Sequence, residues 1–202
     1  MENIASLTHS KSKTARVRTL GREVLEMTLL VSLMFIGVRL LLQNFRVEGP
    51  SMQPTLTTGQ LLWVNKAAYF RWDGQYVLGG PRRGDIAVLH SPEPSDNVDL
   101  IKRIIGLPGD RVRVQDGQVF VNDQVLDEPY ISFQASYNYP ADGRDLTIPM
   151  DQYFVLGDNR ANSRDSHFGW FVPAENLIGR AWLSYWPPAD WGVEPGPVYA
   201  GT

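Results

Sequence analysis

The 202-residue sequence contains no cysteine, which excludes disulfide bonds, thiolate metal sites, iron–sulfur clusters and a cysteine nucleophile. It has only three histidines and no Gly-x-Ser-x-Gly sequence, so the nucleophile turn typical of α/β-hydrolases is missing as well. Its 18 glycines and 14 prolines follow no period, which excludes a collagen-like chain and favours a β protein rich in turns.

Charge is unevenly distributed along the chain. The first 22 residues carry five basic side chains against one acidic, whereas residues 44–202 carry more acidic than basic groups, and the net charge is -3. A nucleic-acid-binding protein would be expected to have a basic folded domain, so we predict no nucleic-acid partner. A short basic segment ahead of an acidic body is typical of a membrane boundary.

Charged residues are absent between Met27 and Val38, where apolar residues cover the whole circumference of a helix. As a helix, residues 24–42 would extend about 28 Å, close to the thickness of a bilayer's hydrocarbon core. The alternatives are a buried helix of a soluble protein, a cleaved secretory signal and an interfacial helix. No small-x-small cleavage site follows the segment, and it has no polar face. We therefore predict one transmembrane helix.

This anchor divides the chain into three predicted regions. Residues 1–22 form a basic tail, of which residues 1–19 show no apolar periodicity and are expected to be irregular. Residues 23–43 form the anchor and residues 44–202 the folded domain. Because the basic residues precede the span, the tail is predicted to be cytoplasmic and the domain extracytoplasmic.

After the anchor the hydrophobic period changes to two, which is typical of β-strands. Asp116-Gly117 separates two alternating segments and is a strong hairpin signal. No long amphipathic helix pattern follows the anchor, so we predict an all-β domain in which residues 131–149 form a long surface loop. The predicted strands are residues 61–65, 85–90, 100–105, 111–122 (the hairpin), 152–156 and 178–185.

Ser51 lies between Gly49-Pro50 and Pro54, directly after the anchor. Glycine permits a tight turn and proline restricts the backbone, so this turn can hold a hydroxyl and its own amide N–H in one direction. A nucleophile combined with an oxyanion donor is what acyl transfer requires. The alternative is a serine that only stabilises a turn, which is the commoner role.

A serine nucleophile needs a base, and Lys102 is a candidate because it lies in an apolar strand. Strand alternation places Lys102 on the same face as Leu100 and Ile104. Burial of that face would lower the pKa of the lysine, so that its neutral amine could accept a proton near pH 7. The alternative is a solvent-facing lysine on an edge strand, and the pattern alone favours it.

Small polar and charged residues crowd into residues 157–169, with aromatic residues on both sides. We interpret this cluster as an ordered polar network near a site. His167 belongs to the cluster, but one histidine without partner spacing is poor evidence for a metal, so we predict no metal site.

Together these segments resemble the type I signal peptidases, the membrane-anchored Ser–Lys endopeptidases of the bacterial leader peptidase family. The resemblance covers nearly the whole chain, because the anchor is followed by four motifs in the family's order. They are Gly-Pro-Ser-Met-Gln-Pro-Thr-Leu at 49–56, Arg-Gly-Asp-Ile-Ala-Val at 83–88, Lys-Arg-Ile-Ile-Gly-Leu-Pro-Gly-Asp at 102–110 and Gly-Asp-Asn-Arg-Ala-Asn-Ser-Arg-Asp-Ser at 157–166.

The resemblance implies Ser51 as the nucleophile and Lys102 as the general base. Ser163 matches the hydroxyl that orients the lysine, and Asp165 matches a structural carboxylate. The implied fold is a β catalytic core with a smaller β insertion, here about residues 110–150. Gly49 stands where some members have a serine as a second oxyanion donor. The positions that match the lining of the shallow substrate pockets are Phe45, Val47, Met52, Leu100 and Ile101.

The implied activity is removal of N-terminal signal peptides from exported proteins after small residues, at Ala-x-Ala type sites. It proceeds through an acyl-enzyme without cofactor or metal, so the expected partners are signal-peptide-bearing precursors and membrane lipid. The host is the cell membrane, or the thylakoid membrane if the source is cyanobacterial or plastid. His167→Ala is expected to leave cleavage largely intact.

Two other functions are possible for such a chain. One is a self-cleaving Ser–Lys protease, against which the predicted anchor and the lack of a helix-turn-helix pattern argue. The other is a catalytically silent, membrane-anchored binding module, which would require Ser51 or Lys102 to be missing or displaced.

Overall fold

The computed structural model describes residues 3–94 and 96–194, and side chains from residue 20 onward. The chain forms two units, one ending at Leu41 and one beginning at Leu42. Its elements are α1 (Asn3–Leu41), β1 (Leu42–Arg46), β2 (Leu61–Asn65), η1 (Ala67–Tyr69), β3 (Arg71–Trp72), β4 (Gln75–Tyr76), β5 (Ile86–His90), β6 (Asp99–Gly106), β7 (Arg111–Gln115), β8 (Gln118–Val121), β9 (Gln124–Val125), β10 (Leu146–Thr147), β11 (Gln152–Leu156), η2 (Ser166–Phe168), β12 (Val172–Pro173), η3 (Ala174–Asn176), β13 (Leu177–Trp186), η4 (Pro188–Asp190) and β14 (Gly192–Val193).

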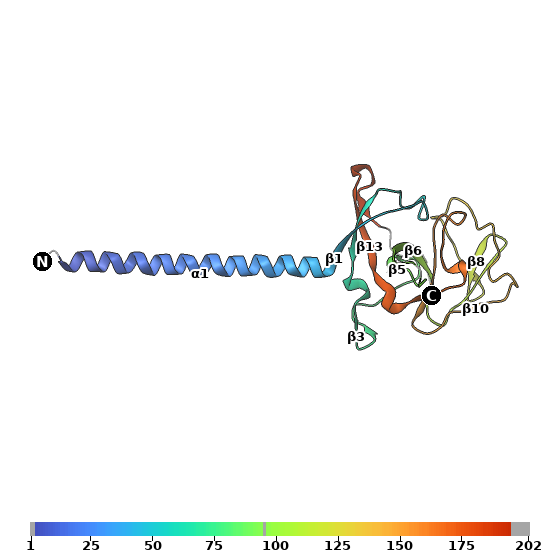
Figure 1. The fold of residues 1–202 in the computed structure, drawn as a ribbon, viewed down its shortest axis with the longest axis horizontal. Helices are drawn as coiled ribbons and strands as arrows, with labels where there is room; N and C mark the ends of the chain where they lie inside the picture. Colours follow the sequence, from blue (N-terminus) through green and yellow to red (C-terminus); the bar gives the residue numbers. More distant parts are fainter. Residues whose placement is uncertain (1–2, 95, 195–202) are drawn as a thin grey trace. The chain divides into compact units, whose positions relative to one another are not determined.

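The first unit is the long helix α1 (Figure 1). Its segment Leu20–Leu41 has 22 residues and a mean hydropathy of 2.0, and none of it is buried within the protein. By length and composition this segment can cross a membrane. The predicted N-terminal apolar helix is therefore confirmed.

The two ends of α1 differ from the sequence prediction. Residues expected to form an irregular tail are helical from Asn3 onward. This stretch contains no proline, and extending a helix that already exists costs far less than nucleating a new one. At the other end, the predicted anchor reaches residue 43, but the helix ends at Leu41. Leu42 instead begins β1, because it pairs with Asn65 of β2.

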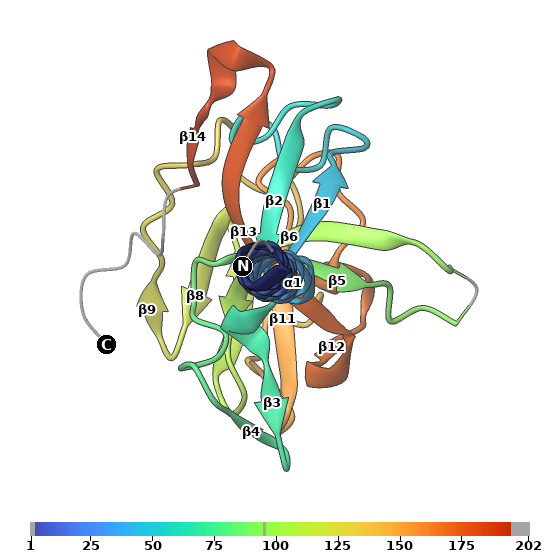
Figure 2. The same cartoon turned by 90° about the vertical axis from the view of Figure 1, so that its left-hand side faces the viewer.

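The second unit is built on an antiparallel sheet with the strand order β1–β2–β13–β5–β6–β11–β12, in which β14 also pairs with β13. The ten-residue strand β13 joins two parts of this sheet (Figure 2), because one half pairs with β5 and the other with β2. Register shifts along β13 bend it between these partners. The sheet therefore curves instead of lying flat.

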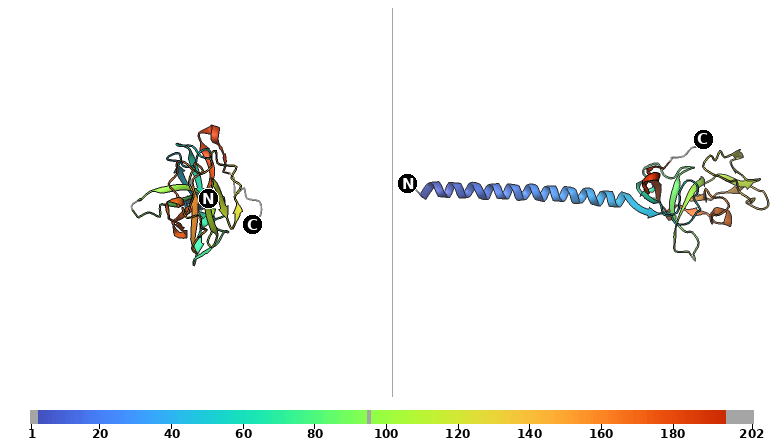
Figure 3. Two further views of the ribbon diagram at one scale, coloured as in Figure 1. Left: turned by 90° about the vertical axis from the view of Figure 1, so that its right-hand side faces the viewer. Right: turned by 90° about the horizontal axis from the view of Figure 1, so that it is seen from above.

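A smaller sheet with the order β10–β7–β8–β9 occupies residues 111–147, the region predicted as a β insertion. Figures 1 and 3 show its yellow-green strands at one end of the β unit. The prediction of a surface loop over residues 131–149 is wrong in part. Ile148 and Ala135 are buried in the apolar cluster between this sheet and β11, and β10 pairs with β7. Two isolated apolar residues in a polar stretch give too little periodicity to reveal such burial.

The predicted strands all occur in the structure within a residue or two of their expected ends, and the all-β prediction is confirmed. They enclose two further apolar clusters. One contains Leu89, Ile104 and Val155, and the other contains Val47, Met52 and Leu62. The second cluster lies directly beneath the segment that carries Ser51.

Gly106 ends β6 where the two sheets meet, and it has no room for a side chain. A Cβ atom there would lie 2.2 Å from Ile148 Cδ1 and 2.8 Å from Val112 Cγ2.

We expect Gly106→Ala to lower the free energy of unfolding by about 1–3 kcal/mol, because the packed core must open to admit the added methyl group. Thermal unfolding of the full chain in detergent measures the effect. Gly192→Ala is the control, since nothing lies within 4 Å of its added Cβ. Equal midpoints for the two variants would contradict this packing.

Candidate active site

A groove of about 460 Å³ lies between the segment that follows β1 and the first half of β6. It brings together residues that are far apart in the sequence. Among the described residues, β11 pairs only with the second half of β6, so residues 99–102 have no strand beside them on the side opposite β5. β1 is the last strand at its end of the sheet. The groove thus runs between two unpaired strand edges. Its lining includes Phe45, Val47, Ser51, Met52, Leu100, Ile101 and Lys102.

Ser51 lies in the turn that connects β1 to β2. Gly49 adopts a φ of 78°, a left-handed conformation that glycine adopts at little cost. Asn159 holds the turn from the opposite side, because its backbone N–H donates to the Ser51 carbonyl at 3.0 Å and its Nδ2 donates to the Pro50 carbonyl at 3.2 Å. The Ser51 N–H donates to none of the described residues, so it is free to bind a ligand.

Lys102 contacts Ser51 directly. Its Nζ lies 2.7 Å from Ser51 Oγ, within hydrogen-bonding distance. The lysine is only 3% exposed, so the alternative of a solvent-facing lysine is wrong. Burial lowers the pKa of Lys102 to about 8, although the charges of Asp165 and Asp158 act in the opposite direction.

The position of Lys102 follows from the pairing of β6. Lys102 stands opposite Ala87 of β5, and the strand continues into Arg103, Ile104 and Ile105, all buried. Both faces of β6 are covered from Lys102 to Gly106, so the expected alternation of exposed and buried residues does not occur. A lysine held in such a strand loses its water shell, which disfavours the ammonium form.

The loop 157–169 packs against the Ser51 turn through Gly157. A Cβ atom on Gly157 would lie 2.5 Å from the Ser51 carbonyl oxygen and 2.2 Å from Ser163 Oγ, so only glycine allows this approach. The Gly157 N–H donates to Asp165 Oδ2 at 2.8 Å. Ser163 Oγ is buried and has no hydrogen bond to any described residue, Lys102 included. The orienting role of Ser163 stays a prediction.

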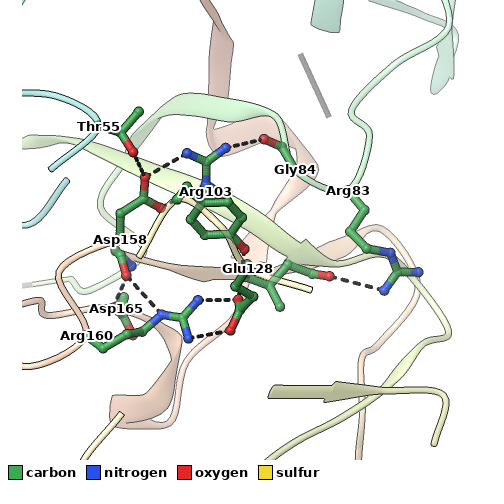
Figure 4. A network of polar contacts seen from close by, with 11 residues as sticks. Thr55, Arg83, Gly84, Arg103, Glu128, Asp158, Arg160 and Asp165 are labelled. Carbon is green, nitrogen blue, oxygen red and sulfur yellow. Dashed lines mark hydrogen bonds and ion pairs between the residues drawn. The ribbon is translucent and has the colours of Figure 1, made fainter. Parts of the chain in front are cut away.

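Two buried ion pairs brace this region (Figure 4). Arg103 Nε and Nη2 donate to the two oxygens of Asp158 at 2.8 and 2.7 Å. Thr55 donates to the same carboxylate, which ties it to the segment after Ser51. Arg160 pairs with Glu128 of the insertion. Among the side chains of residues 20–94 and 96–194, no cluster of three or more histidine or acidic groups is placed to hold a metal ion.

Comparison with known proteins identifies the family. Residues 21–186 match the family described as "Signal peptidase, peptidase S26". The chain belongs to this family. It is 40% identical over 197 residues to "Probable signal peptidase I-2" of Synechocystis, covering 92% of this chain and 82% of the relative. It is 41% identical to "Signal peptidase I" of Leptolyngbya laminosa, with 81% and 79% covered, and 34% identical to "Signal peptidase I U" of Bacillus subtilis, with 87% and 91% covered.

As a member of the signal peptidase family, this protein is a serine peptidase that removes signal peptides from precursor proteins. The apolar helix Leu20–Leu41 and the named relatives together indicate a membrane-anchored enzyme.

Several residues that shape the site of this signal peptidase were not singled out from the sequence, namely Arg103, Arg160 and Glu128 in the ion pairs, and Gly157. Asp158 and Asn159 belong to the cluster that the sequence predicts as an ordered polar network, but their partners were not predicted. One signal was available for Arg103, because isoleucines stand two positions before and after it and share its strand face. A charge flanked in this way must be buried with a partner. Its partner cannot be read from the sequence, since Asp158 lies 55 positions away.

The buried amine costs stability below its own pKa. At pH 7 the lysine is mostly protonated in both the folded and the unfolded chain. Desolvation of the ammonium on folding therefore lowers the free energy of unfolding. Between pH 8 and the ordinary lysine value, only the folded chain loses the proton, and stability rises with pH. We expect Lys102→Met to raise the free energy of unfolding by about 1–3 kcal/mol at pH 7, with the gain shrinking as pH rises above 8.

Chemical denaturation of wild type and Lys102→Met at pH 7 and at pH 9.5 measures this difference. Lys66→Met is the matched control, because it removes a lysine that is partly exposed. A Lys102→Met variant that is less stable than wild type at pH 7 would contradict a desolvated ammonium.

Proposed function

We propose that this signal peptidase cuts its precursors with Ser51 as the nucleophile and Lys102 as the general base. The observation that carries the proposal is the 2.7 Å contact between Lys102 Nζ and Ser51 Oγ in a groove where the lysine is buried. A base with a pKa of about 8 has a useful neutral fraction at physiological pH and is still strong enough to take a hydroxyl proton during attack.

The reaction divides into two halves. In the first, Lys102 Nζ accepts the Ser51 proton while Oγ attacks the scissile carbonyl carbon, and the tetrahedral intermediate collapses as the C–N bond breaks. The departing amine takes the proton from Lys102, which leaves an ester between Ser51 and the signal peptide. In the second, neutral Lys102 accepts a proton from water as it attacks the ester, and Ser51 recovers its proton when the ester bond breaks. Neither half requires a metal or cofactor.

The developing oxyanion needs a donor fixed in place before the reaction. The Ser51 N–H is suited to this task because it belongs to the nucleophile itself and donates to none of the described residues. Asn159 donates hydrogen bonds to the carbonyls of Pro50 and Ser51, which flank the Ser51 N–H. The N–H therefore keeps its direction without reorganising. Gly49 offers no side-chain hydroxyl, so the proposed oxyanion site relies on the backbone.

The two free strand edges beside the groove fit an extended peptide. A substrate segment lying between the β1 side and residues 99–102 would satisfy its backbone groups without regard to sequence. Side chains then select through shape. Val47 and Met52 are fully buried and leave a shallow floor, while Phe45, Leu100 and Ile101 line the walls. We propose that this lining accepts small residues such as alanine at the first and third positions before the cut.

The proposed orientation places the basic N-terminal segment in the cytoplasm and the β unit on the extracytoplasmic side. Ser51 follows Leu41, the last residue of α1, by ten positions, so the anchor tethers the nucleophile near the surface where a signal peptide's cleavage point emerges. Membrane lipid is therefore the environment of the first unit, and the precursor is the partner of the second.

Cleavage of a precursor with an Ala-x-Ala site tests the assignment of nucleophile and base. Detergent-solubilised wild type should cut at that site, whereas Ser51→Ala and Lys102→Met should lose at least about 10³-fold in rate, because each removes a group that acts as a unit with the other. Lys66→Met controls for the loss of a lysine. If Lys102→Met still cleaves, another residue is the base. If folded wild type fails to cut any precursor, the silent binding module becomes the better account.

The pH dependence of cleavage follows from the pKa of Lys102. Because only the neutral amine accepts the Ser51 proton, kcat/KM should rise with pH and level off above about 8, falling roughly tenfold per pH unit well below that value. Initial rates between pH 5 and pH 10 measure the profile. A rate that is constant from pH 5 to pH 8 would be incompatible with a lysine base.

A further inference from the structure

His167 lies in the short helix η2 and takes no part in the reaction steps above. Its Nδ1 lies 2.6 Å from Asp165 Oδ1. An ionised carboxylate can only accept a hydrogen bond, so Nδ1 must carry the proton and donate it to Asp165. The side chain is 16% exposed, so this contact is largely shielded from water.

Aromatic rings hold the imidazole in place. It stacks on Tyr137 of the insertion, with ring centres 4.1 Å apart and planes 17° apart, and Phe168 packs against it at 4.3 Å. The Tyr137 hydroxyl is buried without a hydrogen bond to any described residue, and burial raises its pKa, so the ring stays neutral in the range where the enzyme works. The imidazole therefore keeps one orientation toward Asp165.

Asp165 connects this histidine to the reacting groups. Its second oxygen accepts the Gly157 N–H, and Gly157 packs against Ser51 and Ser163. Asp165 is also the strongest of the charges that raise the pKa of Lys102 against the effect of burial. A group that neutralises or disperses the Asp165 charge therefore favours the neutral amine of Lys102.

We propose that His167 is a positioning residue that holds and partly neutralises Asp165, and thereby sets the pH range in which Lys102 can accept the Ser51 proton. This inference rests on the proposed Ser–Lys mechanism. It gives His167 an indirect role, so the variant without the imidazole keeps its nucleophile and base but needs a higher pH to work.

The other charged groups around this chain of contacts have partners of their own. Asp158, which also faces Lys102, is paired with Arg103. Arg160 and Glu128, which face Tyr137, are paired with each other. Among the described residues, His167 is thus the only ionisable side chain hydrogen-bonded to Asp165. Its removal should change the charge that Lys102 experiences with little effect on the other two pairs.

The test compares kcat/KM between pH 5 and pH 10 for the full-length wild type, His167→Ala and His167→Arg, with a precursor as substrate. In His167→Ala the acid side of the profile should move to higher pH by up to about one unit, which lowers the rate at pH 7 about three- to tenfold and leaves it near wild type at pH 9.5. In His167→Arg a permanent cation faces Asp165, so the acid side should lie at or below its wild-type position. The control is Arg144→Ala, because it also removes a side chain that donates to an aspartate, Asp142, but this pair is exposed and neither residue lines the groove.

A merely structural role for His167 would give a different result. In that case His167→Ala would lose rate equally at every pH and the acid side would not move, which would overturn the inference, as would a shift to lower pH. Failure of the underlying Ser–Lys mechanism gives a different result, because kcat/KM of the wild type would then not rise with pH and level off near pH 8. If His167→Ala does not fold, His167→Arg alone decides, since an acid side above the wild-type position in that variant would contradict neutralisation of Asp165.

Discussion

The burial of one lysine amine beside one serine hydroxyl is the constraint on which the rest of the site depends. An amine becomes a base near neutral pH only where water is excluded, and that requires a strand covered on both faces, here β6 from Lys102 onward. The hydroxyl must then be brought to the amine from elsewhere. The turn after β1 does this, and Gly157 allows the loop 157–169 to lock the turn at van der Waals distance.

Such a site fails if a carboxylate forms an ion pair with the lysine, because the pKa would then return toward its ordinary value. Asp158 and Asp165 both face Lys102, yet neither pairs with it among the described contacts. Asp158 is occupied by Arg103 and Thr55, and Asp165 by the Gly157 N–H and His167. The carboxylate of Asp158 is therefore engaged by the buried arginine at the strand position next to Lys102, and no ion pair joins it to the lysine among the described contacts.

Local periodicity in the sequence predicted the apolar helix and the main strands. The segments that meet at the groove were expected from the resemblance to the type I signal peptidases. The predictions were wrong where contacts between residues far apart in the sequence determine the structure. Leu42 leaves the helix because β2 offers it a partner, and Ile148 is buried because Gly106 leaves room for it. The environment of Lys102 was undecided for the same reason: alternation places a side chain on a face, but which strands and loops cover that face is a property of the whole fold.

The pKa of Lys102 tests this account most directly, and the chain is well suited to its measurement because it contains only four lysines. In protein labelled with ¹³C at lysine Cε, NMR titration follows each amine separately, and the spectrum of Lys102→Met assigns the resonance. We expect the Lys102 resonance to titrate near pH 8. A Lys102 resonance that titrates near the ordinary lysine value would contradict a buried, desolvated amine.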